Sequence, residues 1–251
     1  GYAVLHIDKA RGNDSAMRAH IERTFVPNNV DASRTHLNRD LVQFPANVTN
    51  RTEAIAHRIA TAGIYRKVAD NQVKALRFIL SGSHEDMLQL ESDGRLEEWC
   101  NSTMQWLYTT FGKANVVAAT LHADEETPHI HATVVPIVTG ERRKAKQEAE
   151  NGKRKYKTKK NKIRLCADDL LTPKKLEEYQ TSYAEQMRPF GLSRGVQGSE
   201  AKHRTNMEYY KELLKETKQK QLEEEELIQK VRELEKQAGK LRVKGTLYSL
   251  F

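Results

Sequence analysis

Hydrophobic and polar residues follow two periodicities along this chain, and together they predict a mixed fold. Alternation of apolar and polar residues predicts strands, whereas apolar residues three and four apart predict helices. Strands are predicted over residues 2–7, 72–80, 114–121 and 130–137. Helices are predicted over residues 13–24, 49–63, 83–110 (with a break near 92–94) and 172–187. Because strands lie before, between and after helices, and the last two form an antiparallel pair, we expect an α+β fold with a central antiparallel β-sheet flanked by helices.

The composition changes at residue 199, where Glu, Lys, Gln and Leu become dominant. We therefore divide the chain into a domain over residues 1–198 and a charged tail over residues 199–251, which we expect to form a long C-terminal helix. Apolar positions with heptad spacing follow in this tail: Leu227, Val231, Leu234, Ala238 and Leu241. Such spacing suits a homodimer formed through the tail, and a solvated helix without a partner is the alternative. Heptads this close to residue 251 suggest a longer parent chain.

The net charge indicates the kind of partner. The chain has 251 residues and a formal charge of +8, which favours a polyanion. Residues 141–165 contain twelve Lys or Arg and three Glu, so this segment accounts for the whole excess of positive charge in the chain. We interpret it as a loop that binds a phosphate backbone, with a merely solvated loop as the alternative. The expected DNA contacts in it are Arg142, Arg143, Lys144, Lys153, Arg154 and Lys155.

The cysteines and the hydropathy of the chain indicate the cellular compartment of the protein. Cys100 and Cys166 lie far apart and match no metal-binding or redox spacing, so a disulfide framework is not expected. No apolar run has the length of a membrane span, and residues 1–10 lack the pattern of a signal peptide. We therefore expect a cytoplasmic protein with no membrane span.

Three histidines lie within residues 122–131, in the sequence H-A-D-E-E-T-P-H-I-H. His129 and His131 are two apart in a predicted strand, so their imidazoles project from one face. The acidic segment that ends in Pro128 predicts a turn, and folding back there brings His122 beside them. Three imidazoles that leave coordination positions open suit a catalytic metal, although they do not name it. The alternative is a set of ordinary hydrogen-bonded histidines in a sheet.

This segment resembles the metal motif of MobV-type plasmid mobilisation relaxases, the Mob/Pre family, a branch of the HUH endonucleases. The sequence A-H-I-E-R at residues 19–23 is similar to the family's H-N-x-R motif, and S-R-T-H-L-N at 33–38 resembles its S-R-x-H-L-N element. G-S-E-A-K-H-R-T at residues 198–205 resembles the segment after its catalytic core. Ile21 is a departure, because the family usually has Asn there. The basic segment after the histidines is also longer than in the family pattern.

The resemblance implies an HUH relaxase-like fold and a metal-dependent enzyme that nicks one DNA strand at a plasmid or mobile-element transfer origin, single-stranded or supercoiled. A histidine would attack, the protein would stay joined to the 5′ phosphate, and a free 3′ hydroxyl would start conjugative mobilisation. The implied catalytic residues are His20 as nucleophile, Glu125 as the group that orients or deprotonates it, and Arg23 and Arg66 as contacts of the scissile phosphate.

The implied metal ligands are His122, His129 and His131. Mn²⁺ is the expected ion, with Mg²⁺ and Zn²⁺ as alternatives. The implied DNA contacts outside the basic segment are Arg34, His36, Asn38 and Lys202.

Elementary chemistry supports these roles. A phosphodiester is negatively charged and repels a nucleophile, so transfer needs cations at its oxygens. His20 and Arg23 are three apart in a predicted helix and therefore share a face. Neutral imidazole is a competent nucleophile, and a carboxylate at its other nitrogen fixes the tautomer and stabilises the cation that forms.

Three other functions stay open. The predicted strands 114–121 and 130–137, with the turn between them, are called the metal hairpin below. A rolling-circle replication initiator or transposase of the same superfamily would use a tyrosine on a helix after this hairpin. Tyr179 and Tyr183 lie on such a helix, where their spacing is also that of ordinary aromatic packing. A metal-dependent hydrolase would act without a covalent step. A non-enzymatic DNA-binding protein would use the histidines for structural zinc.

Overall fold

The computed structural model describes residues 1–10, 15–24, 30–140, 146, 150–152, 162–196, 226–232 and 234. The chain divides into two units, Gly1–Glu200 and Ala201–Phe251. In the second unit the described residues, 226–232 and 234, are helical. The rest of the expected C-terminal helix lies outside the described residues, so its length and its pairing stay predictions.

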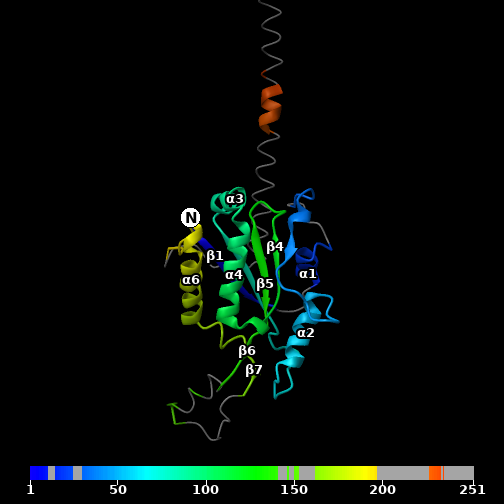
Figure 1. Ribbon diagram of the computed structural model, residues 1–251, viewed down its shortest axis with the longest axis vertical. Coiled ribbons are helices and arrows are strands. Elements are labelled where there is room, and N and C mark those ends of the chain that lie inside the picture. The colour runs from blue at the N-terminus through cyan, green and yellow to red at the C-terminus, as the bar shows by residue number, and fades with distance from the viewer. Residues whose placement is uncertain are drawn as a thin grey trace, which may run out of the picture. The chain divides into compact units, whose positions relative to one another are not determined.

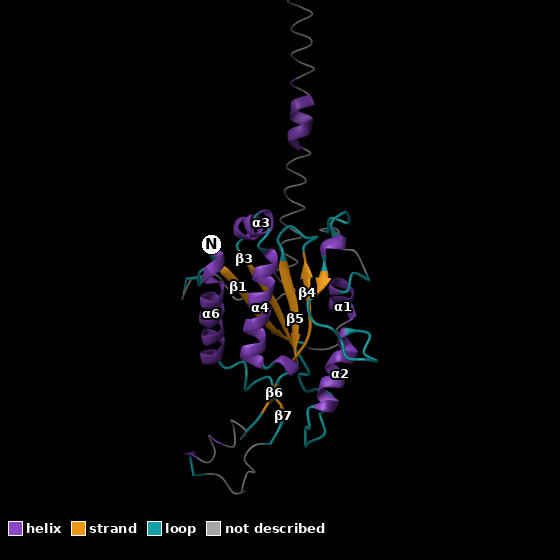
Figure 2. Ribbon diagram, viewed as in Figure 1, coloured by secondary structure: helices purple, strands orange, loops and turns teal. Residues whose placement is uncertain are grey.

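A five-stranded antiparallel sheet forms the centre of the first unit, with the strand order β1-β3-β5-β4-β2 (Figures 1 and 2). Its strands are β1 (Ala3–Lys9), β2 (Arg39–Asp40), β3 (Leu76–Gly82), β4 (Val116–His122) and β5 (His129–Val134), and a separate pair consists of β6 (Ile137–Val138) and β7 (Arg164–Leu165). The α-helices are α1 (Ser15–Ile21), α2 (Arg51–Thr61), α3 (His84–Ser92), α4 (Leu96–Phe111) and α6 (Pro173–Met187). Three short 3-10 helices are η1 (Thr35–Leu37), η2 (Lys113–Asn115) and η3 (Arg188–Phe190). The predicted α+β class is confirmed.

One face of the sheet is apolar and is covered by α3, α4 and α6. Directly opposite residues of antiparallel strands share a face, and Leu80 lies opposite both Leu5 and Ile130. These side chains belong to one buried core together with Trp99 of α4 and Met187 of α6. Figure 1 shows α4 and α6 running alongside the sheet. The apolar face therefore serves stability and leaves the other face for chemistry.

The opposite face of the sheet is polar where β4 and β5 meet. His122 is paired with His129, and Thr120 with His131, so these four side chains project together. The helix α2 packs against β4. It covers part of this face, because Arg51 in its first turn donates from Nη2 to Thr120 Oγ1 at 3.0 Å. The strand pairing thus sets the positions of three histidines before any loop contributes.

The predicted elements are present with ends shifted by a few residues, and the expected break near residues 92–94 separates α3 from α4. One helix is shorter than predicted. The helix α1 ends at Ile21, because Arg23 has a left-handed backbone conformation with φ 52°. The predicted strand 130–137 includes the first residue of β6, but the periodicity does not predict β7, which pairs with β6 at the base of the basic segment 141–165. No helix within the described ranges is long and apolar enough to cross a bilayer.

The apolar layer gives a stability prediction. Trp106 is 4% exposed, packs against Tyr183 with ring centroids 5.1 Å apart, and donates from Nε1 to Ser182 Oγ at 3.1 Å, which links α4 to α6. We expect Trp106→Ala to lower the free energy of unfolding by about 3–5 kcal/mol, because it leaves a cavity. Urea denaturation measures the loss. The control Leu88→Ala, on the exposed side of α3, should cost only about 0.5 kcal/mol. Equal losses in the two variants would contradict this packing.

Candidate active site

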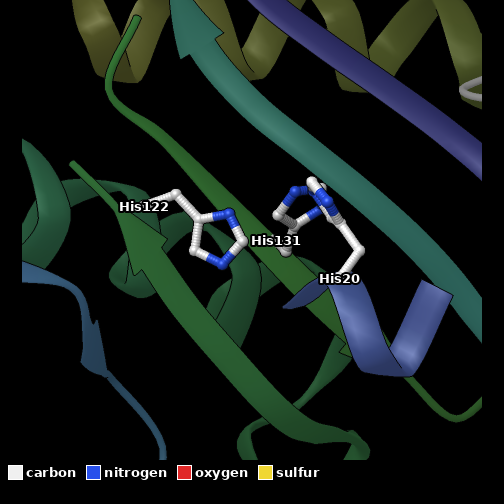
Figure 3. Close-up of side chains that lie close together, drawn as sticks. All are labelled: His20, His122 and His131. Atoms are coloured by element: carbon white, nitrogen blue, oxygen red, sulfur yellow. The ribbon is translucent and has the colours of Figure 1, made fainter. Parts of the chain in front are cut away.

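Four histidines from three elements converge on the polar face of the sheet. His122 ends β4, His129 and His131 lie on β5, and His20 comes from α1. The ring centroids of His122, His129 and His131 are 5.3, 4.8 and 4.8 Å apart in the three pairs. The ring of His20 lies 5.6 Å from that of His122 and 5.5 Å from that of His131. Figure 3 shows the rings of His20, His122 and His131 gathered between the strands and the helix.

Hydrogen bonds direct the ring nitrogens toward a common centre. His129 donates from Nδ1 to the carbonyl of Thr127 at 2.8 Å, which leaves a lone pair at Nε2. That atom lies 3.1 Å from Nε2 of His131. Two imidazoles that bind one ion at about 2.1 Å hold their nitrogens about 3.0 to 3.4 Å apart. Nε2 of His122 lies 3.1 Å from the carbonyl oxygen of Ile21, the kind of contact that orients a metal-binding histidine.

The donor atoms form two overlapping groups that fit a metal ion. One group is His20, His122 and His131, and the other is His122, Glu125 and His129; in each, the ligand atoms lie within 4.8 Å of one another. The three ligands expected from the sequence are therefore distributed over both groups, which share His122. Imidazole nitrogens with one carboxylate suit divalent ions such as Zn²⁺ and Mn²⁺.

Burial favours the neutral form of three imidazoles, those of His20, His129 and His131. It lowers the pKa of His131 well below the ordinary value, and it lowers the pKa of His129 as well. It also lowers the pKa of His20 to about 4, although the nearby Glu125 acts in the opposite direction. Neutral imidazole is the form that binds metals and the form that attacks as a nucleophile. The site therefore offers nitrogen lone pairs at neutral pH.

The Oε1 atom of Glu125 is the point at which these groups meet. It lies 3.4 Å from His20 Nε2, 3.2 Å from His122 Nδ1 and 2.7 Å from Arg23 Nη2. Burial raises the pKa of Glu125, but contacts with His122, His129 and Arg23 outweigh burial and hold the pKa well below its usual range. Glu125 is thus an ionised carboxylate beside the ring of His20, in a position to orient it.

Arg23 is bound to carboxylates inside the protein. Its Nε and Nη2 donate to Asp124 Oδ2 at 3.0 Å and Oδ1 at 2.6 Å, and its Nη1 donates to the carbonyl of His20 at 2.6 Å. The side chain is 9% exposed. A contact between Arg23 and the scissile phosphate stays a prediction, because the guanidinium is largely occupied by these partners.

The segment S-R-T-H-L-N lies against the metal hairpin. Asn38 Oδ1 accepts a hydrogen bond from the backbone of Ala123 at 2.7 Å, next to His122. Arg34 pairs with Glu91 of α3 at 2.5 Å, and His36 is exposed. Asn38 therefore supports the end of β4, and DNA contacts by Arg34, His36 and Asn38 stay predictions.

Arg66 makes no described contact with the histidine cluster, and its contact with the scissile phosphate stays a prediction. It is exposed in the loop between α2 and β3, and Val68 of that loop packs in a small apolar cluster with Val117 at the start of β4. His122 ends the same strand, and five strand residues span about 16 Å. The other expected DNA contacts lie outside the described residues: Arg142, Arg143, Lys144, Lys153, Arg154, Lys155 and Lys202.

Tyr179 and Tyr183 lie in the apolar layer on the other side of the sheet. Tyr183 is 0% exposed and Tyr179 is 8% exposed, and both rings pack on Trp106. Burial raises the pKa of Tyr179 to about 12. Because the sheet separates both side chains from the histidines, this arrangement gives no support to a tyrosine nucleophile at the metal site.

Arg51 is a buried charge that the sequence pattern does not single out. It is 4% exposed and donates to Thr133 Oγ1 at 2.7 Å as well as to Thr120. It thereby links the two strands that carry the histidines. The cap formed by Asn50 marks the start of α2, but a cap does not tell which side chain of the first turn points inward.

Comparison with known proteins identifies relatives along most of the first unit. Residues 1–159 match the family described as plasmid recombination enzyme, Mob_Pre. A 65 kDa protein of Zymomonas mobilis subsp. mobilis is 30% identical over 214 residues, which are 83% of this chain and 32% of the relative. A plasmid recombination enzyme type 3 of Staphylococcus aureus is 28% identical over 158 residues, 61% of this chain and 38% of the relative. This chain thus spans about a third of the length of these curated relatives.

The fold is similar to solved structures of a MobM relaxase domain of the MOBV and Mob_Pre group. One, bound to 22-nucleotide oriT DNA of plasmid pMV158 and to Mn, gives a TM-score of 0.66 at 23% identity, covering 84% of this chain and 99% of that chain. Another, bound to 26-nucleotide oriT DNA, gives a TM-score of 0.56 at 18% identity, covering 83% of this chain and 99% of that one. At these identities the likeness establishes a common fold.

Proposed function

This chain belongs to the plasmid recombination enzyme (Mob_Pre) family, and from that membership we propose that it is a metal-dependent relaxase that nicks one DNA strand at a plasmid or mobile-element transfer origin. The observation that carries the proposal is the contact between His20 and Glu125 beside three further histidines. The similar MobM domain is solved with oriT DNA and Mn. A nucleophile, a carboxylate and a set of metal donors are the groups that phosphoryl transfer to a protein requires.

In the proposed reaction His20 is the nucleophile. Its Nε2 faces Glu125 Oε1 at 3.4 Å, so an N–H directed at that carboxylate leaves the lone pair on Nδ1 for attack on phosphorus. The new N–P bond forms at the 5′ phosphate while the bond from phosphorus to the 3′ oxygen breaks. The departing oxygen takes up a proton from solvent water and becomes the 3′ hydroxyl. Glu125 stabilises the positive charge that develops on the ring of His20.

The proposed metal ligands are His122, His129 and His131. A divalent ion held there, with Mn²⁺ expected and Mg²⁺ or Zn²⁺ as alternatives, would supply positive charge that stabilises the phosphate in the transition state. The protein's part is to hold the rings in fixed orientations. The carbonyl of Ile21 does this for His122. Because the backbone makes this contact, it does not depend on the Asn that the family usually has at this position.

Mapping nicks in a pool of supercoiled plasmids tests the proposed function. With Mn²⁺ present, we expect one strand to be cut at one position in the plasmid that carries the cognate origin. Cutting at many unrelated positions would favour a metal-dependent hydrolase. Tight DNA binding with no cut in any plasmid would favour a non-enzymatic protein with structural zinc.

The basic segment over residues 141–165 is proposed to bind the phosphate backbone. Removing residues 142–162 should weaken DNA binding broadly and flatten its salt dependence, since each lost phosphate contact lowers the slope of log affinity against log salt by about 0.7–0.9. Fluorescence anisotropy at several NaCl concentrations measures this slope, with an insert of equal length made of Gly and Ser as the control. An unchanged slope would assign the segment to a different partner.

DNA is the proposed partner, and the cytoplasm is the expected location. Pairing of two chains through the heptad positions stays a prediction. The described residues include three of these positions, Leu227, Val231 and Leu234, and their side chains are exposed. Sedimentation of the full chain, with and without residues 226–251, measures whether a dimer forms.

A further inference from the structure

Asp124, which the sequence pattern leaves without a role, lies where three separated segments meet. It is 1% exposed. Both of its carboxylate oxygens accept hydrogen bonds from Arg23, and Oδ2 also accepts one from Thr35 Oγ1 at 3.1 Å. Its backbone carbonyl accepts a hydrogen bond from the backbone of Asp31 at 2.8 Å. Asp124 therefore joins the turn after α1, the segment around η1 and the metal hairpin.

Arg23 extends these contacts to Glu125. Its Nη2 donates both to Asp124 Oδ1 at 2.6 Å and to Glu125 Oε1 at 2.7 Å. Two parallel hydrogen bonds between an arginine and a carboxylate fix the plane of the guanidinium. Asp124 therefore determines where Nη2 holds Glu125, whose Oε1 in turn lies 3.4 Å from His20 Nε2.

The backbone of Arg23 indicates that this arrangement is strongly constrained. Its φ of 52° lies in the left-handed region, which costs energy for a residue with a side chain. Such a conformation persists where the surrounding contacts over-determine it. The contacts here are the pair with Asp124, the bond to Glu125 and the bond to the carbonyl of His20.

We infer that Asp124 is a positioning residue for the proposed strand transfer: it fixes Arg23, Arg23 fixes Glu125, and Glu125 orients His20. The inference rests on the proposed function and extends it to a second carboxylate. Asp124 acts without touching DNA or metal, because its two oxygens are already bound by Arg23 and Thr35. The two adjacent carboxylates of the hairpin thus have different roles.

The variant Asp124→Asn keeps the size of the side chain and removes the charge that binds Arg23. We expect its single-turnover nicking rate to fall about 10- to 100-fold, as for other residues that orient a site from outside it, while the affinities for origin oligonucleotide and for Mn²⁺ change by less than about threefold. Glu126→Gln removes an exposed carboxylate of the same turn and should leave all three quantities unchanged. Wild-type nicking by Asp124→Asn, or a loss of Mn²⁺ binding as large as the loss of rate, would overturn the inference.

The coupling between Asp124 and Arg23 can be measured without any activity. Arg23→Gln leaves Asp124 as a buried carboxylate without its guanidinium, whereas Arg23→Gln combined with Asp124→Asn leaves a neutral pair. We therefore expect the double variant to have a higher Tm than Arg23→Gln alone. Additive decreases in Tm would show that the two side chains do not act through each other.

Nitrogen-15 NMR of the histidines in the metal-free protein measures directly which nitrogen of His20 is protonated. The signals of His20 are identified by their absence in His20→Ala. We expect a single tautomer protonated at Nε2 in the wild type and in Glu126→Gln, and a mixture of tautomers in Asp124→Asn. If the His20 signals show the same tautomer in the wild type, Glu126→Gln and Asp124→Asn, the positioning role of Asp124 is overturned, whatever the nicking rate of the wild type. If the expected spectra are found and the wild type nicks no plasmid, the proposed function fails while the positioning role stands.

Discussion

His131→Ala is expected to slow nicking at a cognate origin by about a thousandfold or more, because a bound metal contributes several kcal/mol to the transition state and about 1.4 kcal/mol corresponds to a factor of ten in rate. His131 is 3% exposed, and its Nε2 lies 3.1 Å from His129 Nε2. The variant lacks this nitrogen at the centre of the cluster. The affinity for origin DNA should be largely retained, since the expected DNA contacts lie elsewhere on the chain.

Conversion of supercoiled plasmid to the open circular form measures the rate, and a gel-shift assay measures the affinity. His57→Ala removes an exposed imidazole of α2 and is the matched control, with nicking expected at the wild-type rate. Chelation should stop the wild-type enzyme, and Mn²⁺ should restore it but should not restore His131→Ala. Nicking at full rate in excess chelator would contradict a role for the metal.

The metal hairpin shows how much the sequence alone can predict. Alternation places His129 and His131 on one face, and the turn before Pro128 brings back His122. These inferences succeed because the two strands are neighbours in sequence, so one short turn determines their pairing. The helices of the apolar layer are predictable for a similar reason, since their periodicity is local.

Arg23 and Arg66 show where local sequence patterns are insufficient to predict the position of a side chain. Helical spacing predicts that His20 and Arg23 share a face, but α1 ends at Ile21 and Arg23 reaches Glu125 through its left-handed backbone. Arg66 has no periodic context, and its place depends on the packing of its loop at the other end of β4. Tertiary contacts of this kind leave no signal in a single stretch of sequence.

Asp124 and Arg51 depend on contacts between distant segments. Asp124 is 101 residues from Arg23, and Arg51 is 69 and 82 residues from the threonines that it binds. Sequence spacing therefore identifies the histidines that lie together but not the charged residues that hold them in place. The composition of residues 141–165 and 199–251 predicts charge and helix, and most of these residues lie outside the described part of the chain.

His20→Ala is expected to remove the covalent protein–DNA complex entirely and to slow nicking by about 10⁴-fold or more, as loss of a nucleophile does in other enzymes. The reason is that the other three histidines of the described cluster, His122, His129 and His131, are the proposed metal ligands, whereas His20 lies 3.4 Å from Glu125 as the proposed nucleophile. The double variant Tyr179→Phe with Tyr183→Phe should retain the complex, because both rings lie across the sheet from the histidines. A gel that separates free protein from the DNA-linked form measures both outcomes.

The acid stability of the trapped bond tests the histidine nucleophile most directly. A phosphorus–nitrogen bond hydrolyses in mild acid once the nitrogen is protonated and survives alkali, whereas a tyrosyl phosphodiester survives the same acid. The complex formed on an origin oligonucleotide would be divided, one part treated with acid and the other digested for peptide mass spectrometry. We predict an adduct on the 5′ side of the cut that is lost in acid and maps to the peptide containing His20. An acid-stable adduct on the peptide containing Tyr179 and Tyr183 would contradict this account.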